Sequence, residues 1–164
     1  MSKQVKLLFT ILAIVAGAIT LKVLLSDQEA ESDGTITFIL IDASQEEVIN
    51  EEVDFHIGDT IFDIINREYE VVCADEDYKP DPTCSYNSPY GKAILEINDV
   101  TTDWYSSFLA LYINNQYANY GVSKLPYNDG DTIRFSWTPL SWKRQMRLPY
   151  LPHVLRYYLF KNKY

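Results

Sequence analysis

The sequence predicts an α+β fold in which one short helix packs across a mixed β-sheet. Several short runs alternate apolar and polar residues and are rich in β-branched side chains, as half-buried strands are. Only one segment of the body places its apolar residues at helical spacing. A hydrophobic content of 47% in 164 residues is enough for the core of one domain with appendages.

The first three elements follow one another closely. The runs Thr35–Asp42 and Glu47–Phe55 predict two antiparallel strands joined by a turn near Ser44-Gln45. Gly58-Asp59 ends the second run, and Asp59 or Thr60 can cap the helix that follows. This helix is short and must pack on a sheet to be stable. Its apolar face carries Ile61, Phe62, Ile64 and Ile65.

Four further strands are predicted at residues 69–73, 92–99, 107–115 and 131–137. The strand at 107–115 ends in Asn114-Asn115, which is typical of turns because asparagine tolerates positive φ. A loop over residues 119–131 ends in an Asp-Gly turn, and the last strand closes the sheet. One helix across a mixed sheet, in this order, is the β-grasp pattern, which we assign to residues 35–138.

Residues 1–25 predict a signal anchor. Leu7 to Leu25 is an apolar stretch of 19 residues, about the length of a helix that spans a bilayer. Lys22 lies near its end, where a lysine can reach the interface. Lys3 and Lys6 favour a cytoplasmic N-terminus. We therefore expect a single-pass protein of the cell membrane with an extracellular C-terminal domain.

A cleavable signal peptide is the alternative, because Ala16-Gly17-Ala18 has the form of a cleavage site. Cleavage there would leave a short apolar region before it and an apolar new N-terminus after it. We favour the uncleaved anchor, followed by a short, acidic and flexible linker at residues 26–34.

Charge divides the chain sharply. All 23 acidic residues lie between Asp27 and Asp131, and residues 27–138 contain only five basic residues, which gives residues 27–138 a net charge of −18. Such a body repels phosphate backbones and excludes nucleic acid as a partner. The tail, residues 139–164, has six basic residues, several aromatic rings and no acid. It suits anionic lipid or a wall polymer, the acidic body itself, or a partner protein.

Cys73 and Cys84 are expected to form a disulfide outside the membrane, although two free buried thiols are an alternative. No other soft ligands accompany them, so they do not predict a metal site. Four carboxylates of the loop between them could chelate Ca²⁺, but they lack the spacing of an EF-hand, and a solvated acidic loop is preferred. These are Asp75, Glu76, Asp77 and Asp81.

Catalysis has little support. The chain has two histidines, and it contains no G-x-S-x-G elbow, H-E-x-x-H helix or phosphate-cradling glycine loop. Its many carboxylates form no recognisable acid–base motif. We therefore expect a protein that is not an enzyme.

Three segments of the body resemble the transcobalamin-like C-terminal domain, the DUF4430 family of bacterial surface proteins. "GDTIFDII" at residues 58–65 resembles the family's helix entry, G-x-T followed by apolar residues. "LYINN" at 111–115 resembles its Y-x-V-N-G strand end. Residues 120–125, 129–133 and Trp137 resemble its closing G-x-x-x-x-x-L-x-D-G-D-x-I/V motif. The likeness extends over about 100 residues, from Thr35 to Thr138.

The resemblance implies an extracellular β-grasp module that binds a small molecule or presents one to a transporter. In vertebrate cobalamin carriers the related domain closes over cobalamin with a large helical domain, so a cobalamin-type ligand is implied, and no other cofactor. This chain has Phe108-Leu109 where the family has Gly-Trp, and Asn115 where it has Gly. Trp104 is a candidate substitute for the missing tryptophan.

Residues 108–138 allow two interpretations. They form a strand pair with a long loop, in which Gly121 and Gly130 serve backbone geometry. Alternatively their rings and amides edge a ligand surface. A concave pocket lined with Tyr and Asn would favour ligand binding, and a flat sheet would favour docking of another protein. The candidate ligand residues are Tyr112, Asn114, Tyr117, Asn119, Tyr120 and Tyr127.

Overall fold

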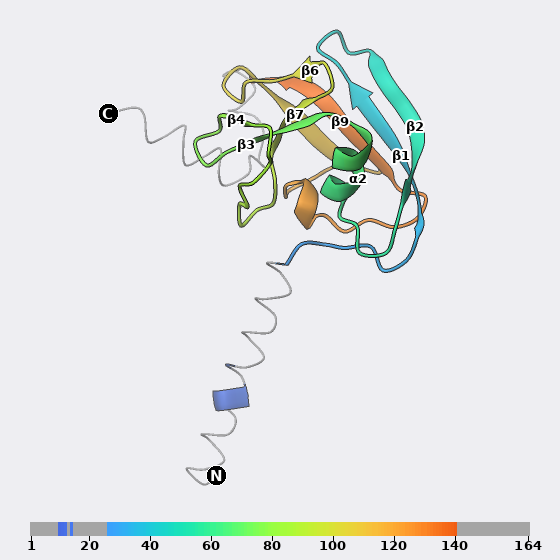
Figure 1. Ribbon diagram of the computed structural model, residues 1–164, viewed down its shortest axis with the longest axis vertical. Helices are drawn as coiled ribbons and strands as arrows, with labels where there is room; N and C mark the ends of the chain where they lie inside the picture. The colour runs from blue at the N-terminus through green and yellow to red at the C-terminus, as the bar shows by residue number, and fades with distance from the viewer. Residues whose placement is uncertain (1–9, 13, 15–25, 141–164) are drawn as a thin grey trace, which may run out of the picture.

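The computed structural model describes residues 10–12, 14 and 26–140 (Figure 1). Its larger layer is a five-stranded sheet with the strand order β2-β1-β9-β7-β8. β1 and β9 run parallel, whereas the other neighbouring strands are antiparallel. The predicted α+β fold with a mixed sheet is therefore confirmed. The strands are β1 (Gly34–Ile41), β2 (Glu47–Phe55), β7 (Ser107–Ile113), β8 (Gln116–Tyr117) and β9 (Thr132–Pro139).

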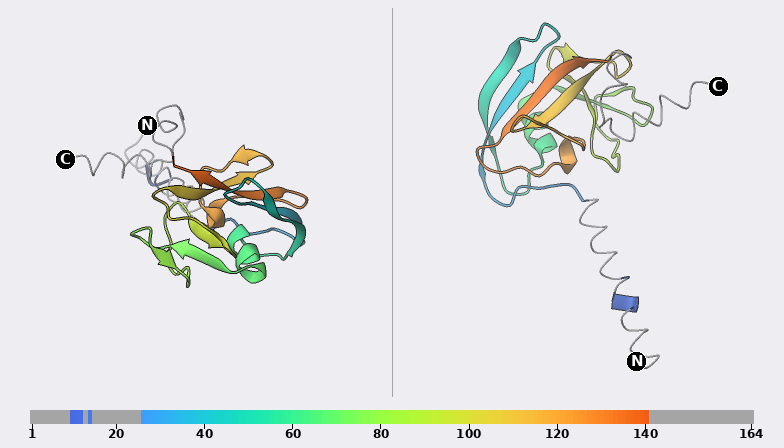
Figure 2. Two further views of the ribbon diagram at one scale, coloured as in Figure 1. Left: turned by 90° about the horizontal axis from the view of Figure 1, so that it is seen from above. Right: turned by 180° about the vertical axis from the view of Figure 1, so that it is seen from behind.

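A second, four-stranded sheet corrects the expectation that all strands share one sheet. Its order is β4-β3-β5-β6, and every pairing in it is antiparallel. Alternation of apolar and polar residues identifies a strand but does not indicate which strand it pairs with. In the structure β3 pairs with β4 and β5, which follow it in the chain. Figure 2 shows this small sheet on the same side of the large sheet as helix α2 (Ile61–Glu68). Its strands are β3 (Val71–Ala74), β4 (Pro80–Asp81), β5 (Ile94–Ile97) and β6 (Val100–Thr101).

Helix α2 begins with a capping box at Thr60. The Thr60 side chain accepts from the Asp63 amide, and the Asp63 carboxylate accepts from the Thr60 amide at 2.9 Å. At the other end of the helix, Arg67 donates to the Asp59 carboxylate at 2.8 Å. Burial opposes ionisation of Asp59, but the His56 amide and Arg67 outweigh it and lower the pKa of Asp59. The helix is thus fixed at its start by sequence-local contacts.

The core lies between the large sheet, α2 and the small sheet. Ile36, Phe38 and Leu40 of β1 are fully buried, and so are the three isoleucines that α2 directs inward. The ring of Phe38 stacks on Tyr69 with centroids 4.7 Å apart and lies 6.0 Å from Phe135 of β9. Burial of each such side chain contributes about 1.5–3 kcal/mol. This packing holds the large sheet rigidly behind the loops described below.

The predicted turns adopt the backbone that their residues favour. Gln45, Asn114 and Asn115 have φ of 67°, 48° and 66°, and Gly130 has φ of 80°. Asn114-Asn115 joins β7 to β8, an edge strand that the sequence did not predict. A short 3₁₀ helix, η1 (Val122–Lys124), interrupts the predicted loop.

The acidic segment at residues 26–34 lies against the body, which corrects the expectation of a flexible linker. The Gln28 amide donates to the Ser123 carbonyl at 3.0 Å, and the Ala30 amide donates to the Asp59 carbonyl at 2.8 Å. Ala30 is buried, and Lys124 forms an ion pair with Asp27 at 3.0 Å. This segment therefore fixes where the chain enters β1.

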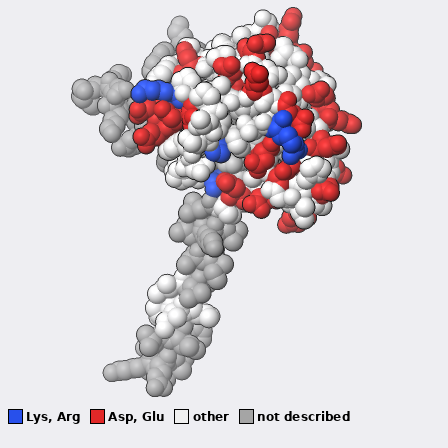
Figure 3. All heavy atoms as spheres, in the orientation of Figure 1, with Lys and Arg blue, Asp and Glu red and all other residues white. Residues whose placement is uncertain are grey.

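The predicted anchor, Leu7 to Leu25, lies almost wholly outside the described residues, as does the tail beyond residue 140. Within the described part of the chain, no helix is long and apolar enough to cross a bilayer. The charge of the described body is visible on its surface. Acidic side chains cover much of the face seen in Figure 3, and few basic ones interrupt them.

Candidate ligand-binding cavity

A cavity of about 320 Å³ opens beside the small sheet. Three segments enclose it: the cysteine loop after β3, the loop that leads into β5, and the stretch from β8 to η1. The volume lies at the lower end of the range for small-molecule sites. Aromatic side chains supply most of the wall: Tyr78, Tyr86, Tyr90, Trp104, Phe108, Tyr117 and Tyr120.

The floor of the cavity is apolar and rigid. Leu109 and Leu111 of β7 and Phe135 of β9 reach it from the large sheet, and all three are buried in the core. Ile94 of β5 and Val122 of η1 complete it. A ligand in this cavity would therefore rest on the inner face of the large sheet.

Tyr78 and Trp104 form a stacked pair in the wall of the cavity. Their rings stack with centroids 5.1 Å apart and an interplanar angle of 16°, and Trp104 meets Phe108 edge-on at 6.3 Å. Tyr78 has φ of 61° and Trp104 has φ of 63°, in the left-handed region that bulky residues rarely adopt. Such strain concentrates at functional sites. Here it directs two large rings toward the same opening.

Two glycines bring the second and third segments together. The Gly121 amide donates to the Tyr90 carbonyl at 2.6 Å, and the Val122 amide donates to the Lys92 carbonyl at 3.1 Å. A side chain at Gly121 would collide with the Lys92 carbonyl and lie 2.6 Å from the Gly91 carbon. Because Gly121 lacks one, Tyr90 and Tyr120 share one side of the cavity.

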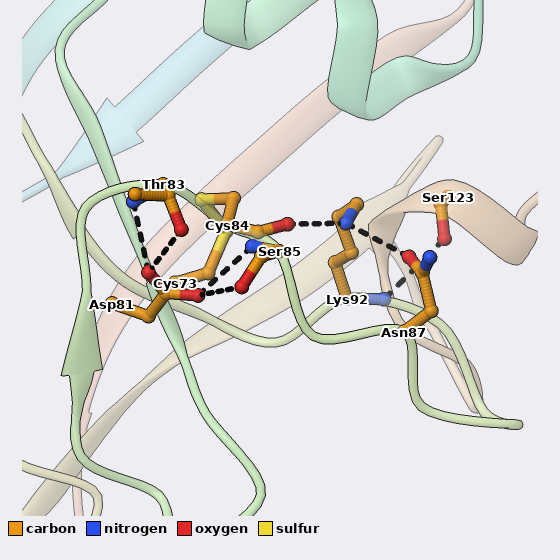
Figure 4. Close-up of a disulfide and its surroundings, with 8 residues drawn as sticks. All are labelled: Cys73, Asp81, Thr83, Cys84, Ser85, Asn87, Lys92 and Ser123. Carbon is orange, nitrogen blue, oxygen red and sulfur yellow. Dashed lines mark hydrogen bonds between the residues drawn. A yellow bond between two sulfur atoms is a disulfide. The ribbon is translucent and has the colours of Figure 1, made fainter.

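A disulfide fixes the first segment. Cys73 and Cys84 are bonded with their Cα atoms 5.0 Å apart, which confirms the predicted pairing (Figure 4). Beside it, Asp81 accepts from the amides of Thr83 and Ser85 at 2.9 and 2.8 Å. Hydrogen bonds from Thr83 and Ser85 lower the pKa of Asp81 to about 2. The loop that presents Tyr78 is therefore closed covalently and braced by this carboxylate.

Lys92 lines the cavity, but its ammonium group is engaged elsewhere. Figure 4 shows the side chain directed to the Cys84 carbonyl and to Asn87, at 2.5 and 2.9 Å. The ammonium also lies 5.0 Å from the centre of the Phe62 ring. The Lys92 charge thus holds the second segment against the disulfide.

Three of the six predicted ligand residues line this cavity: Tyr117, Asn119 and Tyr120. Tyr120 is 54% exposed, and its ring is available from solvent. Burial, with Tyr112 beside it, raises the pKa of Tyr117. The cavity is concave and carries both Tyr and Asn, which is the arrangement that favours ligand binding.

The other three predicted residues do not line the cavity. Tyr127 is buried, packs edge-on against Phe55 and donates to the Asp59 carbonyl at 2.7 Å. Asn114 donates to the Asp131 carboxylate at 2.7 Å and accepts from the Thr132 amide at 2.9 Å. Tyr112 lies under the Arg134 guanidinium, 4.5 Å from its carbon. These side chains stabilise the hairpin and the loop.

The sequence analysis did not identify the aromatic residues that face residues 117–121 from other parts of the chain. Tyr78, Tyr86 and Tyr90 lie in and after the cysteine loop, and Phe108 begins β7. The signal was a cluster of tyrosines in a proline-rich stretch that lacks β-alternation. Nothing in the sequence indicated that this stretch meets residues 117–121.

The acidic loop is organised by its own hydrogen bonds. Asp75 accepts from the amides of Asp77 and Lys79, both at 2.8 Å, and Asp81 accepts from the loop near the disulfide. Among the described residues, no group of three or more His, Cys, Asp or Glu side chains is arranged to hold a metal ion. These hydrogen bonds fix the backbone of the loop.

Two solved structures resemble this chain, and the first of them has a TM-score above 0.5 and shares its fold. Haptocorrin in complex with Cbi, a transcobalamin-like protein, superimposes with a TM-score of 0.51 over 68% of this chain and 26% of its own, at 9% identity. A protein from Ruminococcus gnavus ATCC 29149, named for a proposed metal-binding role, gives a TM-score of 0.48 over 66% of this chain and 99% of its own, at 15% identity.

The sequence comparisons define the family. None of the curated proteins matches the chain. The family model described as a domain of unknown function, DUF4430, matches residues 58–139, which include α2, the small sheet, the cavity and β9. This chain therefore belongs to the DUF4430 family.

Proposed function

We propose that this chain is a membrane-anchored extracellular module that binds a small molecule in the aromatic cavity. The observation that carries the proposal is the concentration of seven aromatic side chains around one opening of about 320 Å³. Rings of this kind supply contact area at low entropic cost, and a few polar groups fix orientation. The rigid apolar floor and the closed cysteine loop prepare the site before the ligand arrives.

A corrinoid is one ligand class that the fold supports. About two thirds of this chain superimposes on haptocorrin, whose structure is a complex with Cbi, but the match spans about a quarter of that protein. A module of this size would cover one face of a corrinoid or present the ligand to a transporter.

The proposed location rests on the sequence of the N-terminus and on the disulfide. An apolar stretch of anchor length precedes the body, and a disulfide persists in oxidising compartments. The basic tail would then contact anionic lipid, a wall polymer or a partner protein near the membrane. We propose no catalytic role and no nucleic-acid partner.

Thermal unfolding of the full-length chain in detergent tests the proposal. Corrinoids, other vitamins, glycans and Ca²⁺ are added in turn, and a ligand at a hundredfold over its Kd should add about 2.7 kcal/mol to the free energy of unfolding. Tyr120→Ala should lose the shift. Tyr105→Ala is the matched control, because Tyr105 is 74% exposed and does not line the cavity.

Docking of another protein is the second candidate, since exposed tyrosines are also typical of interfaces. Tyr86, Tyr90 and Tyr120 are all exposed at the mouth of the cavity. If no compound shifts the unfolding transition, the small-molecule proposal is wrong. The exposed rings would then be tested as a contact surface for a protein partner.

A further inference from the structure

We propose that the ligand of the aromatic cavity carries a quaternary or protonated ammonium group. This inference rests on the proposed small-molecule function and names the chemical class of the ligand. Its basis is the combination of aromatic rings with two carboxylates at one opening, Asp75 and Glu76, and with a lysine whose charge is engaged elsewhere.

The rings supply the first part of the argument. A cation over an aromatic face is attracted by the negative face of the ring, and tryptophan attracts it most strongly. Trp104 and Tyr78 form a stacked pair, and Tyr90 and Tyr120 stand at the opening with 50% and 54% of their surface exposed. Rings left exposed around a cavity contribute little to the core and are typical of binding sites.

The carboxylates supply the second part. Asp75 uses one oxygen to accept from the amides of Asp77 and Lys79, which holds the carboxylate at the edge of the cavity. Within the part of the chain that the structure describes, Glu76 makes no hydrogen bond or ion pair. Lys79 pairs with Asp77 at 3.1 Å and so leaves Glu76 uncompensated. Both carboxylates favour a positive ligand.

Lys92 is the one basic side chain among the lining residues, and it does not oppose a cation strongly. Its ammonium donates to the Cys84 carbonyl and to Asn87 and lies over Phe62, as Figure 4 shows for the first two contacts. The body around the cavity has 23 acidic and five basic residues, a net charge of −18. A field of this sign concentrates cations at the surface and repels anions.

Size is consistent with this class of ligand. The cavity of about 320 Å³ is near the smallest that small-molecule sites show, which suits a compact head group. A larger molecule would place its ammonium group between the rings and extend its remainder into solvent. A neutral sugar would gain the ring contacts and could donate hydrogen bonds to the carboxylates, but it would gain no charge attraction.

The test is isothermal titration of the full-length chain in detergent with choline and with 3,3-dimethyl-1-butanol, the uncharged molecule of the same shape. We expect choline to bind about tenfold more tightly, which corresponds to about 1.4 kcal/mol and lies between the values of an exposed and a desolvated cation–π contact. Tyr120→Phe should keep this preference, because it retains the ring. Tyr120→Ala should reduce choline affinity several-fold.

Charge is tested with a matched pair of variants. Glu76→Gln should reduce the affinity for choline several-fold. The reduction should become smaller as salt is added, because salt screens the charge of Glu76. Glu52→Gln makes the same change on the exposed face of β2, away from the cavity, and should leave binding unchanged. Equal effects of the two variants would show that only the general charge of the body matters, and would overturn the proposed site.

The outcomes separate this inference from the proposed function. If the uncharged analogue binds as tightly as choline and Tyr120→Ala weakens both, the ammonium preference is wrong but the cavity still binds ligands. If choline does not bind while a corrinoid or glycan does, and Tyr120→Ala abolishes that binding, the ammonium inference is wrong but the proposed function stands. If nothing binds at the cavity, both proposals are wrong.

Discussion

Tyr127 donates its hydroxyl proton to the backbone carbonyl oxygen of Asp59 across 2.7 Å. The two residues are 68 positions apart, and the bond joins the loop before β9 to the start of α2. The same carbonyl accepts from the Ala30 amide at 2.8 Å, which brings the segment before β1 to this point. Three distant parts of the chain therefore meet at one oxygen atom.

Tyr127→Phe should lower the free energy of unfolding by about 1 kcal/mol, the usual net value of one hydrogen bond. The loss stays small because the Ala30 amide still satisfies the Asp59 carbonyl. Urea denaturation at pH 7 measures it. Tyr105→Phe, at an exposed ring, is the control and should have no effect. A loss as large in the control would contradict this role for Tyr127.

The same variant should change stability in alkaline solution. Burial raises the pKa of Tyr127 from 10.0 to about 12. A pKa raised on folding contributes stability that is complete below pH 10 and is lost as the pH rises from about 10 to 12. The difference in unfolding free energy between wild type and Tyr127→Phe should therefore shrink across this interval. A difference that stays constant from pH 9 to 12 would contradict it.

The Tyr78–Trp104 stack leads to a variant that separates binding from folding. Trp104→Asn keeps a residue that tolerates the observed φ of 63° but removes the ring. Relief of backbone strain, about 1–3 kcal/mol, offsets the lost stacking, about 0.5–1.5 kcal/mol. The free energy of unfolding should be maintained or rise slightly, while choline binding falls at least tenfold.

Trp104→Phe is the matched control, because it keeps an aromatic ring at the same position. It should retain most of the choline affinity, whereas its strained backbone should give no gain in stability. Titration and urea denaturation of both variants give the comparison. Unchanged binding in Trp104→Asn would show that the ring does not form part of the site.

Elements with strong local determinants were predictable from the sequence. Thr60 caps α2 because its hydroxyl and the Asp63 carboxylate are three positions apart, and Asn114-Asn115 turns because asparagine tolerates positive φ. The disulfide followed from the expected compartment and was confirmed. The second sheet was not predictable, because β3 and β5 read as strands without indicating that they pair with each other.

Half of the predicted ligand residues line the cavity, and the sequence did not indicate its other walls. Tyr117, Asn119 and Tyr120 stood out as rings and amides in a loop, and the structure brings them to the opening. The opposite wall depends on the contact between Gly91 and Gly121, which are 30 positions apart and carry no pattern that links them. Tyr127 was chosen for the same reason as Tyr120, but its surroundings are apolar and bury it.

Asn114 and Asn115 should respond differently to the same substitution. Both have positive φ, so glycine preserves the backbone at either position. Asn114→Gly also removes the hydrogen bonds to Asp131 and Thr132 and should cost about 1–2 kcal/mol. Asn115→Gly should stay within about 0.5 kcal/mol of wild type, because Asn-Gly is a favoured hairpin turn. Similar losses in urea denaturation would contradict a special role for Asn114.

The Cys73–Cys84 disulfide should stabilise both the fold and the cavity. It closes a loop with a sequence separation of 11 that carries Tyr78, Asp75 and Glu76. In the chain-entropy model a loop of this length contributes about 2–3 kcal/mol. The variant Cys73→Ala with Cys84→Ala should lose this amount in urea denaturation. It should also bind choline more weakly, because ordering the loop then opposes binding.

Reduction of the wild-type chain distinguishes the effect of breaking the disulfide bond from the effect of removing the two sulfur atoms. The double variant does both at once. A reductant breaks the cross-link but leaves both side chains in place, where they are almost fully buried. If the covalent closure of the loop matters, the reduced wild type and the double variant should show similar losses of stability and of choline affinity. If reduced wild type binds choline as tightly as the oxidised protein, the cavity does not depend on the closed loop, and its shape must come from the Gly91–Gly121 contact and the floor of the large sheet.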